Sequence, residues 1–437
     1  MNHPTLRYMV SAFSVLVCSI GLHAQYQEGH KEVEAPYRVQ ILESLGGSFS
    51  SPNGINNHGL LMGVANLPGD QAAHAVVWRQ DKDYAIKDLG TLGGPNSGVN
   101  WSVNDNRGIA VGASDTSTID PNGENFCNLS PTGSDLYVCL GFAWQNGPLM
   151  SLPTLGGNNS YAFEVNNRGQ VAGIAETGTP DPSCTPPQVL DWEAVIWGPR
   201  PGEIQQLPLL PGDTVGAATA INSQGTAVGT SGPNCTSVSS EPHAVLWEKG
   251  SVTNLGSLGG LLENIAFGIN DQGQVVGFSD LPGDTTTHAF LWTKENGMQD
   301  LGTLPGDINS YAYGINSKGQ VVGDSNGGSY DRAFLWQDGV MVDLNSLIPP
   351  NSNLYLLVSN QINDRGEIAC MACVFSNGAC TSEMPPVVLI PTHGEADYRL
   401  NSRIASASGN PVPKVIIPED VREQLHRRMG FRQQLRK

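Results

Sequence analysis

A short motif in this chain has the form of a serine nucleophile. Gly323-Asp324-Ser325-Asn326-Gly327 matches the Gly-x-Ser-x-Gly pattern, which in hydrolases places the serine on a sharp turn between a strand and a helix of an α/β sheet. The same Gly-x-Ser spacing recurs at Gly112-Ala113-Ser114 and Gly277-Phe278-Ser279. A serine that recurs at one place of a repeat indicates a structural role, so we predict no catalytic residue here.

Three histidines open short apolar runs: His74, His243 and His288. Histidine serves as a base or as a metal ligand, but these three belong to the first, fourth and fifth copies of a repeat. On a ring, the first copy would be far from the other two. We therefore expect each imidazole to form a hydrogen bond to a neighbouring loop. The corresponding positions of the other copies are Gly141, Glu193, Arg332 and Pro386.

One acidic segment has the residue types of a calcium site. In Asp120-Pro121-Asn122-Gly123-Glu124, side-chain oxygens recur at alternate positions, and oxygen ligands are those that Ca²⁺ prefers. The segment is shorter than an EF-hand loop. Asp120, Asn122 and Glu124 are the candidate metal ligands, and a simple turn is the alternative. No other cofactor is predicted.

The cysteines fit an oxidising compartment. Seven of the eight lie beyond residue 24. The sequence predicts three disulfides, which pair Cys127 with Cys139, Cys184 with Cys235 and Cys373 with Cys380. The second pair would join insertions of two consecutive repeats. Cys370 is left over, and a zinc site of Cys370, Cys373, Cys380 and His393 is the alternative to the third pair.

The two ends of the chain differ from the region between them. Residues 1–24 combine Arg7, an apolar run from Tyr8 to Leu22, and a small residue, Ala24. This is the pattern of a secretion signal, with a retained anchor as the alternative, and we expect no other membrane span. Residues 399–437 predict a linker and a basic tail with helical spacing from Glu419 to Met429. We expect a secreted, periplasmic or extracellular protein.

Composition excludes some classes of function. The formal net charge is −18, which disfavours binding to nucleic acid. Charged residues make up 15%, while the chain holds 52 glycines and 29 prolines. This balance is typical of an all-β protein with many tight turns.

A unit of about 50 residues recurs seven times and predicts the fold. Each copy contains an asparagine before a turn, at Asn56, Asn104, Asn166, Asn222, Asn270, Asn316 and Asn363. Each unit reads as four short strands, for example 311–316, 320–323, 333–336 and 341–344. In six of the seven copies the third strand ends in tryptophan, which we expect to pack between repeats. A period of this length indicates a repeat architecture such as a propeller.

The seventh copy lacks its fourth strand, and the N-terminus contains a match for it. Residues 39–47 agree with residues 252–260 at six of nine positions. We predict a seven-bladed β-propeller with four strands per blade, over residues 36–398, in which the N-terminal strand completes the last blade beside 387–390. Closure of this kind protects the edges of the ring.

The repeated motifs resemble a known family. His-Ala-Val at His74 and His243, His-Ala-Phe at His288, and the Gly-Ile-Asn and Asp-Leu-Gly-Thr-Leu motifs are similar to the HAF-type bacterial extracellular repeat over roughly residues 39–391. The resemblance implies an exported bacterial protein. It implies no activity, because the family is defined by its repeat pattern.

The insertions predict where function resides. The long ones, at 115–140, 176–191 and 231–242, all join second to third strands, so they gather on one face of the ring. Binding residues favour variable loops on a rigid frame. We expect a binding or scaffolding module that holds a glycan, a protein or a cell-surface polymer on this face. The alternatives are a polysaccharide-active hydrolase or lyase and a structural repeat without a ligand.

Overall fold

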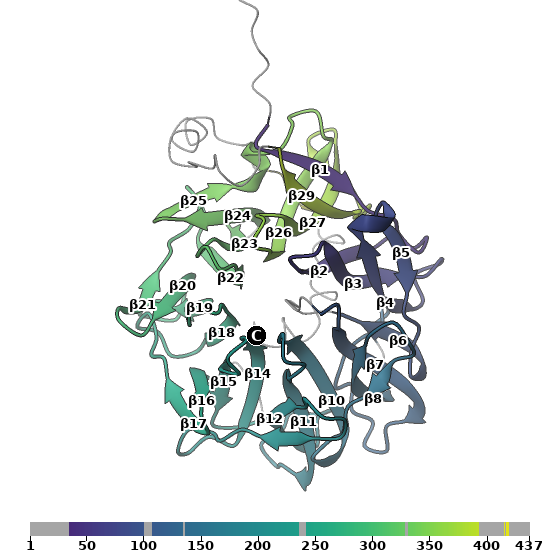
Figure 1. Ribbon diagram of the computed structural model, residues 1–437. Helices are drawn as coiled ribbons and strands as arrows, with labels where there is room; N and C mark the ends of the chain where they lie inside the picture. Colours follow the sequence, from purple (N-terminus) through teal and green to yellow (C-terminus); the bar gives the residue numbers. More distant parts are fainter. Residues whose placement is uncertain are drawn as a thin grey trace, which may run out of the picture. The chain divides into compact units, whose positions relative to one another are not determined.

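The computed structural model describes residues 35–99, 107–133, 136–235, 242–327, 331–392, 415, 417 and 418. The predicted signal peptide and nearly all of the predicted C-terminal linker and tail lie outside these residues. The described strands form seven antiparallel sheets arranged in a ring (Figure 1). The predicted seven-bladed β-propeller is confirmed.

Six blades take their strands in chain order from the centre outward. Blade 1 consists of β2 (Ser50–Ile55), β3 (Leu60–Asn66), β4 (Ala73–Arg79) and β5 (Ala85–Asp88), with the 3-10 turn η1 (Gln80–Lys82). Blade 2 consists of β6 (Gly93–Gly98), β7 (Ala110–Ile119), β8 (Tyr137–Trp144) and β9 (Met150–Ser151). Blade 3 consists of β10 (Gly156–Val165), β11 (Val171–Pro180), β12 (Leu190–Trp197) and β13 (Ile204–Gln206).

Blades 4 to 6 have the same plan. Blade 4 consists of β14 (Val215–Ile221), β15 (Ala227–Gly232), β16 (His243–Glu248) and β17 (Ser251–Asn254). Blade 5 consists of β18 (Asn264–Ile269), β19 (Val275–Asp280), β20 (Thr287–Thr293) and β21 (Gly297–Asp300). Blade 6 consists of β22 (Asn309–Ile315), β23 (Val321–Asn326), β24 (Asp331–Gln337) and β25 (Val340–Asp343), followed by η2 (Leu344–Ser346).

Blade 7 joins the two ends of the ring. Its order is β26 (Leu354–Ile362), β27 (Ile368–Ser376), β29 (Pro386–Pro391) and then β1 (Tyr37–Ile41), and β28 (Ala379–Cys380) extends β27. Val39 lies opposite Leu389 in the antiparallel register. Thr392 adds a side-chain hydrogen bond of 2.9 Å to the carbonyl of Ala35. The predicted closure by the N-terminal strand is confirmed.

The turn asparagines organise the hairpin between the first two strands of each blade. Asn270 accepts hydrogen bonds on Oδ1 from the backbone N–H groups of Gln272 (3.1 Å) and Gln274 (3.0 Å). Gly273 follows with φ +78°, a conformation that favours glycine. Residues near Asn56, Asn166, Asn222, Asn316 and Asn363 repeat the two backbone contacts.

The same asparagines connect neighbouring blades, which the sequence analysis did not predict. Asn270 Nδ2 donates to the backbone oxygen of Asn316 at 3.0 Å, and Asn363 donates to that of Asn56 across the closure, also at 3.0 Å. We call this series the asparagine belt: Asn56, Asn166, Asn222, Asn270, Asn316 and Asn363. Asn104 lies outside the described residues.

Apolar packing fills the seams between blades. Trp78, Trp197 and Trp247 are buried, and their indole N–H groups donate to backbone oxygens of the preceding blade. Burying an aromatic side chain of this size contributes about 2–3 kcal/mol. The structural role predicted for these tryptophans therefore has a direct physical basis.

Deletion of residues 25–47 should destabilise the ring strongly. Blade 7 would lose its outer strand together with the buried Tyr37, so we expect Tm to fall by about 10 °C or more. The control is deletion of residues 25–34, which leaves β1 in place. An unchanged Tm for the longer deletion, measured by calorimetry, would contradict the role of β1.

Asn270→Ala should lower the free energy of unfolding by about 2–4 kcal/mol, because it leaves buried backbone groups of two blades without partners. The control is Gln272→Ala in the same turn, where the side chain is exposed. Urea unfolding of both variants checks the difference. Equal stabilities would show that the belt is dispensable.

Candidate functional site

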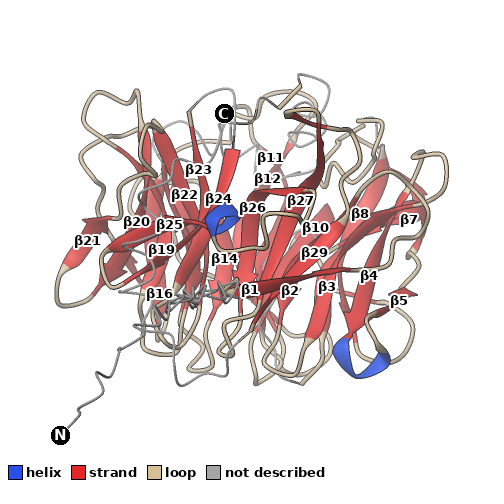
Figure 2. Ribbon diagram, turned by 90° about the horizontal axis from the view of Figure 1, so that it is seen from above, coloured by secondary structure: helices blue, strands red, loops and turns tan. Residues whose placement is uncertain are grey.

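Two faces of the ring differ in their loops. We call the loop face the side that carries the connections from the second to the third strand of a blade and from the fourth strand to the next blade. The longest connection in this set follows β7, and the predicted insertions after β11 and β15 belong to the same set. The turns of the asparagine belt and η1 lie on the opposite side, with η1 at the lower edge in Figure 2. The predicted gathering of the insertions on one face agrees with this topology.

Three disulfides tie the loop face, in the predicted pairs. Cys127–Cys139 closes the insertion of blade 2, Cys184–Cys235 joins blades 3 and 4, and Cys373–Cys380 lies in blade 7. Cys370 is a buried free cysteine, and burial raises the pKa of its thiol. The alternative zinc site would need two sulfurs that are already joined, and its His393 lies outside the described residues.

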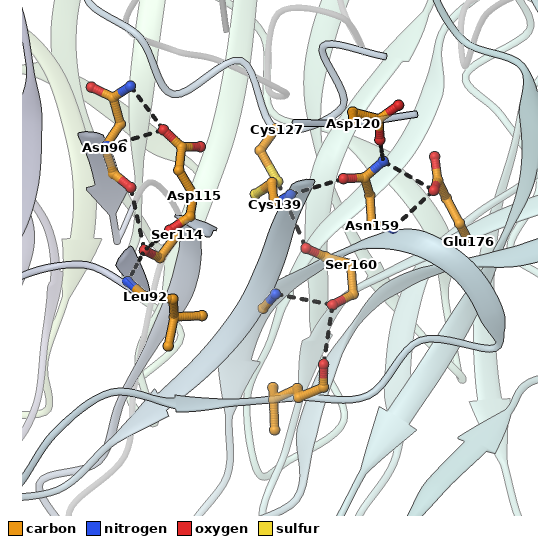
Figure 3. The surroundings of a disulfide bond; sticks show 12 residues. Leu92, Asn96, Ser114, Asp115, Asp120, Cys127, Cys139, Asn159, Ser160 and Glu176 are labelled. Carbon is orange, nitrogen blue, oxygen red and sulfur yellow. Dashed lines mark hydrogen bonds between the residues drawn. A yellow bond between two sulfur atoms is a disulfide. The ribbon is translucent and has the colours of Figure 1, made fainter. Parts of the chain in front are cut away.

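Buried carboxylates gather beneath the insertions of blades 2 and 3 (Figure 3). The Asn159 amide donates to Asp120 Oδ2 (2.9 Å) and Glu176 Oε2 (3.0 Å). The Gln188 amide likewise donates to Glu176 Oε1 (2.8 Å) and Glu124 Oε1 (3.2 Å). All three carboxylates are nearly or fully buried. The two amides thus connect insertions that are far apart in the sequence.

The predicted calcium ligands belong to this cluster. Asp120 Oδ1 accepts the backbone N–H of Asn122 (2.8 Å) and of Glu124 (3.2 Å), and the Asn122 amide donates to Glu124 Oε2. The backbone N–H groups of Val189 and Leu190 both donate to Glu124 Oε1 at 2.8 Å. A metal ion would have to replace these donors, and calcium binding here stays a prediction.

Among the described residues, one group brings at least three potential metal-ligand atoms within 4.8 Å of one another: Asp181, Cys184 and Cys235. Both of its sulfurs belong to a disulfide, and a disulfide sulfur is not the thiolate that binds metal. This group therefore offers one carboxylate rather than a metal site.

The carboxyl groups of blade 3 have raised pKa values. Burial, reinforced by the nearby Glu124, raises the pKa of Glu176 to about 7 despite the hydrogen bonds from Gln188 and Asn159. Burial and the neighbouring Asp191 raise the pKa of Glu193 to about 8. Glu193 Oε2 and Asp191 Oδ1 have no hydrogen-bond partner within the described part of the chain. In the sequence, the indication of an unusual carboxyl group was that Glu193 stands where three other copies have histidine.

The three repeated histidines have structural partners, but the expected hydrogen bond to a loop is found for His243 and not for His74 or His288. His74 lies 2.9 Å from Asp88 and His288 lies 2.9 Å from Asp300, each at the end of the fourth strand of its own blade. His243 instead lies 3.2 Å from Asp213. In blade 6 the buried Arg332 replaces histidine and pairs with Asp307 (2.7 Å) and Asp343 (3.3 Å).

Ser325 likewise has a structural environment. Its hydroxyl accepts the backbone N–H of Leu304 (3.0 Å) and donates to Asp307 Oδ2 (2.8 Å). At Gly323 a Cβ would overlap the carbonyl oxygen of Tyr311. The glycine and serine of the nucleophile-like motif are thus explained by packing of the first two strands and by the loop before them.

A pocket of about 340 Å³ lies between blades 1 and 2, on the face opposite the insertions. Its lining includes Trp144, Arg79 and Arg107, together with His58 and Asp81. The sequence analysis did not find it, because its residues come from turns of two repeats. In the sequence, the indication of this pocket was the presence of two arginines in turns of a chain with few charged residues.

Exposed apolar side chains favour the loop face. Nine large hydrophobic residues are exposed among those the structure describes. Seven of them lie in or beside connections of the loop face: Ile41, Ile119, Leu136, Val189, Leu261, Leu262 and Ile308. An accumulation of apolar residues on one face is typical of an interaction surface.

Comparisons with known proteins give similarity in the fold alone. No family model and no curated protein matches the chain. Solved structures that are similar include puromycin hydrolase (14% identity, TM-score 0.48, 82% of this chain and 55% of that chain). An acylaminoacyl peptidase from Pyrococcus horikoshii is also similar (14% identity, TM-score 0.38, 65% of this chain and 42% of that chain). So is TolB from Acinetobacter baumannii (10% identity, TM-score 0.36, 77% of this chain and 80% of that chain). The chain spans about half the length of the two hydrolases.

Glu193→Gln should stabilise the protein at alkaline pH. Between about pH 4.5 and 8 the unfolded chain loses the Glu193 proton while the folded chain retains it, so the stability of the natural protein falls as pH rises through this range. Glutamine does not titrate. We expect the variant to be about 1–3 kcal/mol more stable at pH 9 and nearly equal at pH 4.5.

The measurement is urea unfolding at both pH values, with Glu295→Gln, an exposed position, as the control. A stability difference that is the same at pH 4.5 and pH 9 would show that Glu193 does not titrate in this range.

Proposed function

We propose that this protein is a secreted binding or scaffolding module that holds its ligand on the loop face. The expected ligands are a glycan, a protein or a cell-surface polymer. The observation that carries the proposal is the location of the exposed large hydrophobic residues, seven of nine of which belong to that face among the described residues. Because the blades beneath form a closed ring, these residues are presented from a rigid frame, which reduces the entropy lost on binding.

The proposed location outside the cytoplasm has two supports. Three disulfides on the loop face fit an oxidising compartment. The resemblance to the HAF-type bacterial extracellular repeat, with the signal sequence expected at residues 1–24, points the same way. No helix among the described residues has the length and apolar character needed to span a membrane.

A polysaccharide-active enzyme is the less favoured alternative. Glycoside cleavage uses two carboxyl groups on opposite sides of a bound sugar. Glu124 and Glu176 have the right chemistry, but both are fully buried and a single amide, that of Gln188, donates to both. This leaves no room for a substrate between them and favours a structural role for the pair.

A binding screen tests the proposal. The protein should be applied to glycan, cell-wall polymer and protein arrays, in calcium and again in chelator, which also tests the predicted ion. Leu261→Ser/Leu262→Ser should weaken binding of the ligand found by at least about tenfold if the exposed face carries it. Met150→Ser, at an exposed position on the outer strand β9, is the control. Absence of a saturable ligand in both conditions would remove the proposal and leave a structural repeat.

A further inference from the structure

An apolar cluster lies at the centre of the ring and receives side chains from every blade. Figure 1 shows β2, β10, β14, β18, β22 and β26 nearest the centre. Their buried aromatic residues include Tyr161, Phe163, Phe267, Tyr313 and Tyr355. The ring centroids of Phe267 and Tyr313 lie 5.2 Å apart, and those of Tyr161 and Phe163 lie 5.0 Å apart. We call this set the inner cluster.

The inner cluster extends toward the loop face. It includes Phe126 and Leu129 from the insertion of blade 2, Cys235 from that of blade 4, and Met384 before β29. All of these follow second strands, whose ends lie on the loop face. The cluster is therefore reached from the same side on which the proposed ligand binds.

Two residues from the C-terminal region complete this cluster. Val415 is 2% exposed and Ile417 is 0% exposed, and both belong to the inner cluster. Val415 and Ile417 are two positions apart, which is the spacing at which side chains of an extended peptide point to one side. In the sequence this segment reads Val415-Ile416-Ile417-Pro418 and is separated from the last strand, β29, by residues 392–414. A short apolar piece of chain thus occupies a site built by seven blades.

Removal of this piece would uncover aromatic surface at the loop face. Water contact with such a surface is unfavourable, and concave apolar sites with aromatic walls are typical of ligand sites. Tyr355 belongs to the inner cluster and has a buried hydroxyl with no hydrogen-bond partner among the described residues. The site therefore has the properties of a peptide-binding cavity that the chain itself fills.

We propose that the inner cluster is a receptor for an extended peptide with alternating branched apolar residues, and that Val415 and Ile417 occupy it in cis until a partner's peptide displaces them. This inference rests on the proposed function, since the partner approaches the loop face, and it specifies the ligand as a peptide. The partner's segment would resemble Val-x-Ile-Pro. No covalent step is involved.

Tethering predicts a large difference in apparent affinity. A segment that is covalently joined to the protein that binds it has an effective concentration on the order of 1 mM. A free peptide that binds the empty site with a Kd of about 10 μM would then need about 1 mM to displace the tethered copy. Release of the tail should therefore tighten binding of the free peptide by roughly 100-fold.

The test uses the full chain and a labelled synthetic peptide of residues 411–420. Fluorescence polarisation should show weak binding to the natural protein and binding at least tenfold tighter to Val415→Asp/Ile417→Asp. A peptide carrying the same two substitutions should bind neither protein. Equal affinity of the natural peptide for both proteins, with the variant folded by calorimetry and circular dichroism, would overturn the proposal.

A second arrangement covers the case in which the double variant does not fold. A protease site placed within residues 399–413 of the full chain allows cleavage after folding. The fragment that contains Val415 should stay with the ring on gel filtration at protein concentrations well above the Kd of about 10 μM, and it should leave when excess synthetic peptide is added. A fragment that leaves without peptide, or that excess peptide cannot displace, would overturn the proposal.

The two proposals fail in distinguishable ways. The synthetic peptide could bind the ring whose tail has been cleaved or substituted while the arrays give no partner. The inner cluster would then remain a peptide receptor, and the proposed binding function of the loop face would be lost. If the arrays give a ligand whose affinity is the same for the natural protein and for the tail variant, the loop-face function stands and the peptide receptor is lost.

Discussion

The side-chain amide of the turn asparagine is the contact on which the ring depends. An amide has both an acceptor and donors, and this position uses both: its oxygen shapes the hairpin of its own blade, and its nitrogen reaches the backbone of the next blade. Aspartate would keep the first function and lose the second, and serine is too short to span both. Because the bond from Asn363 to Asn56 has the geometry of the others, the closure repeats an ordinary seam between blades.

This constraint divides the two faces of the molecule. Turns on the side of the asparagine belt must keep a fixed length and register, since each contacts its neighbour. Loops on the other side carry no such belt among the described residues, and the long insertions occur there. Disulfides and bridged carboxylates fasten these insertions locally, for example Cys184–Cys235 between blades 3 and 4. The connections of the loop face therefore differ in length and sequence from blade to blade, while the strands beneath them repeat.

Features that depend on local sequence could be predicted, and features that depend on distant contacts could not. Turn residues such as glycine and asparagine at the ends of short apolar runs predicted the strands. The match of residues 39–47 to the fourth strand of another copy predicted which strand closes the ring. Equivalent insertions in consecutive repeats suggested the Cys184–Cys235 pair. The donation from Asn316 to Asn363, 47 residues away, leaves no local signal. Neither does the burial of Ile417 in the inner cluster, nor the pocket lined by both Arg79 and Arg107.

Blade 3 departs from the repeat in a way that costs stability. It places Glu193 where blades 1, 4 and 5 have histidine, and it buries Glu176. It also buries Glu164, and burial raises the pKa of Glu164 well above the usual value although the N–H of Ile221 donates to it. Buried acids of this kind weaken the fold as they ionise, and such groups gather where function requires them. The same blade supplies Tyr161, Phe163 and Trp192 to the inner cluster and shares a disulfide with blade 4. Blade 3 thus carries both the carboxyl groups with raised pKa values and part of the apolar receptor wall.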